Sequence, residues 1–163
     1  MICNYRTIKI NNTQLKVFKL IESMPNKFPT FEILDNRILL FFRLAFVNGL
    51  RPALKIVFDK DLWIEIKKEK PLILNKGESL GPFTLTLVEK PTVYMFKLDS
   101  FFFNCKTGYS MEPDKEGMLL SFDLTAENPS VVEKIWWFFV KPIHFILADK
   151  VLKRIKKEVE AIK

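Results

Sequence analysis

The one histidine of this chain and two of its three tyrosines are candidates for donating protons or orienting a ligand. His144 is the only histidine, and because an imidazole titrates near neutral pH, it could donate a hydrogen bond or act as a general acid–base. Lys141 lies one helical turn earlier and could bind a ligand carboxylate or extend its ammonium group to solvent. Pro142 frees a backbone carbonyl, so His144 could equally be a structural residue bonded to that carbonyl. Both roles of His144 stay open.

Tyr94, Tyr109 and Cys105 fall at apolar positions of alternating segments, which predicts that they face inward. Hydroxyl groups in an otherwise apolar pocket fix the orientation of a ligand, although a buried tyrosine can also simply bind a backbone group. We expect Cys105 to be inert, because a buried thiol without a basic partner is unreactive.

Several kinds of site are not expected. One histidine without a cluster of cysteines or carboxylates argues against zinc, and five dispersed glycines form neither a phosphate-binding loop nor a dinucleotide fingerprint. A nucleophile elbow is also missing. We therefore expect no metal and no cofactor, and an enzyme built on this chain would have to use His144 with Tyr94 or Tyr109.

The formal net charge of +7 is compatible with an anionic partner. However, the lysines are scattered, and those between 153 and 157 are followed by Glu158 and Glu160, which is typical of the solvated face of a helix. Motifs of nucleic-acid-binding folds do not accompany them. We expect no nucleic-acid partner.

The two cysteines, Cys3 and Cys105, follow no disulfide or metal-binding spacing. The first residues lack the apolar run of a signal peptide, and the apolar stretch 135–148 is shorter than the roughly 20 residues that a membrane-spanning helix needs. These features predict a cytoplasmic protein.

A long helix over residues 131–160 is the element on which the rest of the chain depends. Ser130 and Glu133 have the spacing of a capping box, and Pro142 predicts a bend near Phe138. Apolar residues recur at helical spacing and define an inward stripe, which projects back to His144, Lys141 and Trp137. The stripe consists of Ala148, Val151, Leu152, Ile155, Val159 and Ile162.

If that stripe is inward, the opposite side of residues 135–146 is aromatic and must be covered by something. We expect this side to contact a membrane surface or to form a homodimer. Its residues are Trp136, Phe138, Phe139, Phe145 and Ile146.

The first half of the chain predicts a strand over Tyr5–Ile10 and a helix over Gln14–Met24, which Pro25 ends. A second helix is predicted over Asp35–Val47, although the same apolar run could be a buried strand. One or two short strands are expected within Arg51–Lys76.

From residue 83 the apolar period changes to two, which predicts four antiparallel strands joined by short turns. The strands are expected over 83–88, 92–99, 101–109 and 118–125, with a hairpin loop over Pro113–Gly117. The apolar face of this sheet needs a cover, and the terminal helix is the long amphipathic element that follows. The predicted inward residues are Phe83, Leu85, Leu87, Tyr94, Phe96, Leu98, Phe103, Cys105, Leu120, Phe122 and Leu124.

This order of elements resembles the helix-grip superfamily, which includes START lipid-transfer domains, birch-pollen allergens and polyketide cyclases. The segment Trp137–His144, the basic run after it, and Gly81-Pro82-Phe83 are similar to an uncharacterised bacterial branch. The resemblance implies a single α+β domain over 1–163, in which a curved antiparallel sheet wraps around a long C-terminal helix and leaves an apolar cavity. It implies no activity, since fold is not function.

Together these observations predict that the cavity binds a small hydrophobic or lipid-like ligand without catalysis. The alternatives are a cyclase, dehydratase or hydrolase that uses His144, and a peripheral membrane or oligomeric interaction protein. The predicted ligand-binding residues are His144, Trp137, Lys141, Tyr94, Tyr109, Phe96, Phe103 and Phe122.

Overall fold

The computed structural model describes residues 1–23, 41, 45, 50–58, 73–80, 83–99 and 103–161. In chain order its elements are β1 (Ile2–Ile10), α1 (Gln14–Glu22), α3 (Leu50–Phe58), β2 (Ser79–Leu80), β3 (Phe83–Glu89), β4 (Val93–Asp99), β5 (Asn104–Asp114), β6 (Gly117–Ala126) and α5 (Val131–Glu160).

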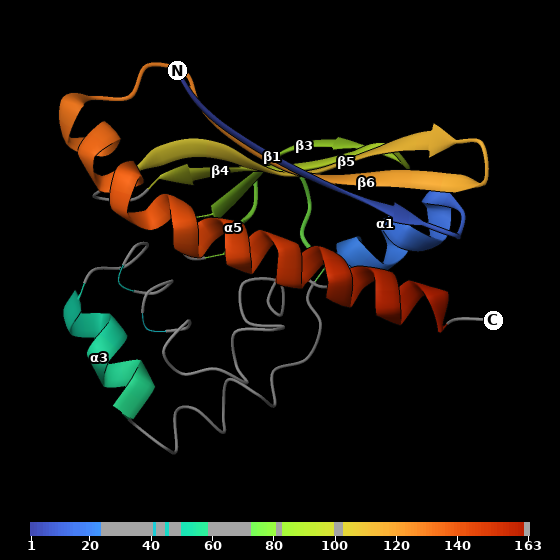
Figure 1. The fold of residues 1–163 in the computed structure, drawn as a ribbon, viewed down its shortest axis with the longest axis horizontal. Helices are drawn as coiled ribbons and strands as arrows, with labels where there is room; N and C mark the ends of the chain where they lie inside the picture. The colour runs from blue at the N-terminus through green and yellow to red at the C-terminus, as the bar shows by residue number, and fades with distance from the viewer. Residues whose placement is uncertain are drawn as a thin grey trace.

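The strands form one antiparallel sheet in the order β1-β6-β5-β4-β3-β2. The four predicted strands are therefore consecutive neighbours, and β1 adds to their far edge by pairing with β6. Figure 1 shows α5 crossing one face of the curved sheet, with α1 beside the C-terminal part of α5. This is the predicted α+β arrangement, in which a sheet packs against a long C-terminal helix.

Alternation along the strands determines which side chains face α5. The predicted inward residues of β4 and β6 are all buried, with exposed fractions of 8% or less, whereas Asn104 is exposed and Asp123 is only half-buried. The predicted register of these strands is therefore confirmed.

Leu87 is an exception to the predicted alternation in β3. The pairing of β3 with β4 shifts between Leu85 and Leu87, and such an irregularity re-aims the side chains that follow it. Leu87 is consequently 37% exposed, while its neighbour Val88 packs against the core. The inward position predicted for Leu87 is wrong.

Other boundaries also differ from the predictions. Strand β1 begins at Ile2 rather than Tyr5, and the β5–β6 turn contains only Lys115 and Glu116 because both strands extend into the predicted loop. The predicted helix Gln14–Met24 is confirmed through Glu22, and Met24 lies outside the described residues.

The middle of the chain is described only in part. Of the helix predicted over Asp35–Val47, only Phe41 and Ala45 are described, and both are helical. Where short strands were expected after Arg51, the structure has helix α3, whose Ala53 is fully buried and whose Leu54 is exposed. Residues 59–72 lie outside the described residues, so short strands in that range stay a prediction.

Helix α5 begins and ends where the sequence predicts. Ser130 Oγ accepts a hydrogen bond from the Glu133 backbone N–H at 3.2 Å, and the Glu133 carboxylate accepts one from the Ser130 N–H at 2.7 Å, which confirms the capping box. The axis of α5 changes direction after its first turns in Figure 1, as Pro142 within the helix predicts.

The capping carboxylate makes the stability of this helix end dependent on pH. Hydrogen bonds from the backbone N–H groups of Ser130 and Asn104 lower the pKa of Glu133. A lowered pKa in the folded state stabilises the fold above the unfolded-state pKa, and this stabilisation is lost as the pH falls below about 4. We expect Glu133→Gln to lower the free energy of unfolding by about 0.5 kcal/mol at pH 7, because solvent screens the charge at this helix end, and by less at pH 3.

Urea unfolding of Glu133→Gln at both pH values measures this effect. The control is Glu89→Gln, at an exposed position at the end of β3. An equal loss of stability for Glu133→Gln at pH 3 and pH 7 would contradict a role for the carboxylate charge.

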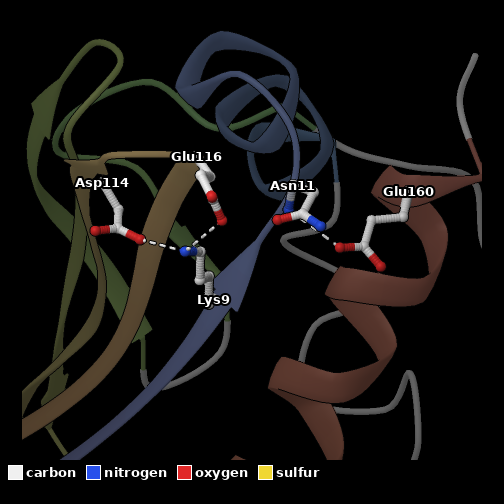
Figure 2. Close-up of polar contacts among 5 residues, drawn as sticks. All are labelled: Lys9, Asn11, Asp114, Glu116 and Glu160. Carbon is white, nitrogen blue, oxygen red and sulfur yellow. Dashed lines mark hydrogen bonds and ion pairs between the residues drawn. The ribbon is translucent and has the colours of Figure 1, made fainter.

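Polar contacts join β1 to the β5–β6 turn and to the end of α5 (Figure 2). Lys9 Nζ lies 2.8 Å from an Asp114 carboxylate oxygen and 3.5 Å from one of Glu116. The backbone N–H of Asn11 donates to Glu160 at 3.1 Å. These contacts lie at the exposed rim, so they add little stability individually, but the bond from Asn11 holds the last turn of α5 against the end of the edge strand.

Candidate ligand-binding site

The first half of α5 contacts the sheet through an aromatic stack. Trp137 is 7% exposed, and its ring lies parallel to that of Phe103, with 5.5 Å between centroids. The His144 ring contacts the rings of Trp137 and Phe122, at centroid distances of 5.4 and 5.7 Å respectively. The structure therefore brings together four of the residues predicted to form the site.

A buried amide orients the histidine. Asn4 on β1 is 4% exposed, and its Nδ2 lies 2.7 Å from Nδ1 of His144. Because an amide N–H donates, Nδ1 accepts this bond, and the neutral imidazole carries its proton on Nε2. The ring is thus held by an edge strand that pairs with β6, at the opposite side of the sheet from β3.

Lys141 does not belong to this group. It is exposed, and its Nζ lies 5.4 Å from the centroid of the Phe145 ring. Its angle on the helix falls within the inward stripe, but a long side chain can bring its ammonium group to water rather than lose its hydration. The inward position predicted for Lys141 is therefore wrong.

Rows of inward side chains cross the sheet perpendicular to the strands. Tyr94, Tyr109 and Phe122 are aligned on β4, β5 and β6, and the rings of Tyr109 and Phe122 are 5.4 Å apart. The adjacent row contains Phe96, Thr107, Leu124 and Asn4. Every member of both rows is buried, so the predicted pocket residues of the sheet share one face with His144.

Two hydroxyl groups in these rows are buried without a hydrogen-bond partner in the described part of the chain. They belong to Tyr94, which is 1% exposed, and Thr107, which is 5% exposed. Burial, together with the charge of Glu22, raises the pKa of Tyr94 to about 12. The phenol is therefore protonated at neutral pH and able to donate a hydrogen bond.

The polar pair Asn4–His144 lies where two parts of the core meet. The larger cluster contains Phe122, Tyr94 and the C-terminal half of α5, and the smaller contains Phe103, Leu98 and Trp137. His144 contacts Phe122 of the first and Trp137 of the second. The polar pair at this junction could contact the polar head group of a ligand whose remainder lies in the apolar interior.

A hollow of about 160 Å³ lies on the other face of the sheet, over the ends of β4, β5 and β6. Its lining includes the exposed Lys97, Asn104 and Lys106, and it contains none of the predicted ligand-binding residues. The apolar cavity expected between the sheet and α5 stays a prediction.

Asn4 and Thr107 were missed as site residues. The alternation of Ile2, Asn4 and Arg6 would have placed Asn4 inward if the predicted strand had started three residues earlier. Thr107 alternates with its exposed neighbour Lys106, but a threonine in a strand is too ordinary to attract notice.

Two further features of the described residues bear on function. Among them, histidine, cysteine and acidic side chains form no group of three that could bind a metal ion. The helices in the described part of the chain include none with the length and hydropathy to cross a membrane.

Comparison of the chain with models of known protein families and with curated proteins finds no match.

Proposed function

We propose that this protein binds a small hydrophobic or lipid-like ligand between the inner face of its sheet and α5, and that it does so without catalysis. The observation that carries the proposal is the pair of buried hydroxyl groups, on Tyr94 and Thr107, without partners among the described residues. A ligand that accepts hydrogen bonds from them would have a carbonyl or hydroxyl head group. Membership of the helix-grip superfamily, with its internal cavity, is part of this proposal.

The energetics support a ligand role for these hydroxyls. A buried hydroxyl without a hydrogen bond costs roughly 1–3 kcal/mol, so a phenylalanine and a valine would stabilise the unliganded protein. The surroundings of Tyr94 are aromatic, with the rings of Phe96 and Phe18 at 5.3 and 5.9 Å. Such walls favour a ligand whose body is apolar and whose polar atoms are few.

The way in which His144 is held favours binding over catalysis. A general base takes up a proton on a ring nitrogen whose lone pair is free. The Nδ1 lone pair of His144 is already engaged by the amide N–H of Asn4, which also fixes the ring. The high pKa of Tyr94 likewise makes its phenol a donor rather than a base at neutral pH.

We expect Tyr94→Phe to weaken binding of an environment-sensitive fluorescent fatty acid by about fivefold to tenfold, the equivalent of one hydrogen bond. The same change should leave the melting temperature equal or higher, because an unpaired hydroxyl is removed. Fluorescence titration and differential scanning calorimetry of the same samples provide both numbers.

Tyr5→Phe is the matched control, because Tyr5 is 58% exposed on β1 and the chemical change is identical. Thr107→Val tests the second hydroxyl at nearly constant volume. If Tyr94→Phe raises the melting temperature but binds the probe as tightly as Tyr5→Phe does, the buried phenol is not a ligand contact. If the unchanged protein binds no probe, the proposed function is wrong.

A further inference from the structure

The outward side of the first half of α5 is a continuous apolar surface. We call it the outer face, and it consists of Val131, Val132, Ile135, Phe138, Phe139 and Ile146. All six are more than half exposed, and the two phenylalanines are 74% and 66% exposed. Two other residues predicted to point outward, Trp136 and Phe145, are half-buried. The Phe145 ring lies beneath the Arg6 guanidinium, with 4.3 Å between its centroid and Arg6 Cζ.

Helical geometry places the outer face on one side. With about 100° per residue, its six residues project within roughly one third of the circumference, opposite Trp137 and His144. Water-exposed aromatic side chains at this density are costly, and a contiguous apolar patch on a folded protein marks a contact surface.

The charges around the outer face are positive. Lys134 and Lys141 are exposed along one border, and farther along the helix the same side carries Lys150, Lys153 and Lys157, all exposed. The acidic groups of this region are already engaged: Glu133 binds the backbone N–H groups of Ser130 and Asn104, and Asp149 pairs with Arg6 at 3.4 Å.

We propose that the outer face docks on an anionic membrane surface, with Phe138 and Phe139 inserted at the boundary between head groups and acyl chains. An apolar helix face flanked by lysines is the pattern of helices that lie in the membrane interface, and each basic residue close to an anionic leaflet strengthens binding. A second copy of the chain fits this surface less well, because an isologous contact would bring the lysines of two like faces together.

This proposal is independent of the proposed ligand binding. The outer face and the candidate site lie on opposite sides of α5, so each can be changed without touching the other. Docking would place the protein where lipid-like ligands occur, but neither test depends on the outcome of the other.

Flotation with large unilamellar vesicles tests the proposal. The vesicles contain phosphatidylcholine alone or two parts of it to one part phosphatidylglycerol, at low salt. We expect binding to the anionic vesicles, and a loss of about tenfold or more in the partition coefficient of Phe138→Glu. The control Leu15→Glu, at a 51% exposed position of α1, should change it by less than about twofold.

A second pair of variants tests the electrostatic part. Lys134→Gln with Lys141→Gln should weaken binding by about fivefold per lysine, whereas Lys16→Gln with Lys19→Gln on α1 should have a smaller effect. All four lysines are exposed, so circular dichroism should show unchanged folding for both double variants.

Three results would overturn the proposal. The first is failure of the unchanged protein to float with anionic vesicles. The second is an equal effect of Phe138→Glu and Leu15→Glu. The third is a dimer in light scattering that Phe138→Glu converts to a monomer, because the outer face would then be covered by a second copy.

Discussion

Replacing Trp137 with alanine is expected to lower the free energy of unfolding by about 3–5 kcal/mol, as for other large-to-small changes of buried aromatic residues. The indole is 7% exposed and lies parallel to the fully buried ring of Phe103. Alanine would leave a cavity at the point where α5 meets the smaller core cluster, and the contact with His144 would be lost as well. Urea unfolding followed by circular dichroism measures the change.

The adjacent residue provides a matched control. Phe138 is also aromatic and on the same helix, but it is 74% exposed, so Phe138→Ala should change stability by less than about 0.5 kcal/mol. The contrast between the two variants tests which side of α5 faces the sheet. Similar effects of Trp137→Ala and Phe138→Ala would mean that the orientation described here is wrong.

The orientation of α5 could be predicted from the sequence because two independent signals agree. Ser130 and Glu133 define the start through backbone hydrogen bonds that any helix must satisfy. The stripe through Val151, Ile155 and Val159 defines the inward side, and all three are buried. Lys141 shows the limit of projection, because an angle on a wheel does not say whether a long side chain bends back to water.

The sheet was predictable where alternation is unbroken. A strict period of two fixes both strand and face, as for Tyr94, Phe96 and Leu98. Leu87 was placed on the wrong face because the irregularity in β3 changes the pairing by one position, and nothing in Thr84–Val88 distinguishes that change from regular alternation. Helix α3 was missed because Leu50–Phe58, which carries only two charged residues, was considered together with the charge-rich stretch that follows it to Lys76.

The candidate site was predictable in its aromatic part and not in its polar contacts. Trp137, Tyr109 and Phe122 follow from the faces of their elements. The bond between Asn4 and His144 joins residues 140 positions apart, and such a pairing depends on the edge-strand position of β1. Local sequence patterns determine which way a side chain points but not which distant group it meets.

A single methyl group on Gly108 is expected to destabilise the sheet strongly. Gly108 lies on β5 opposite Met95 of β4. A Cβ atom there would contact the Tyr94 carbonyl oxygen, and would lie 2.7 Å from Met95 Cα and 2.8 Å from Met95 Sδ. The first two of these atoms are backbone, so the strands themselves would have to separate.

We expect Gly108→Ala to cost about 3 kcal/mol, at the upper end of the range for overpacking. The displaced strand carries Tyr94, so binding of the fatty-acid probe should weaken together with stability. Gly77→Ala is the control: a methyl group there meets nothing within 4 Å, and only the positive φ of 93° opposes it. That strain amounts to about 1–2 kcal/mol, and it lies outside the rows that contain Tyr94 and Thr107. Urea unfolding and probe titration measure the stability and the probe affinity of both variants. A Gly108→Ala protein as stable as the original would show that β4 and β5 are not in the close contact described.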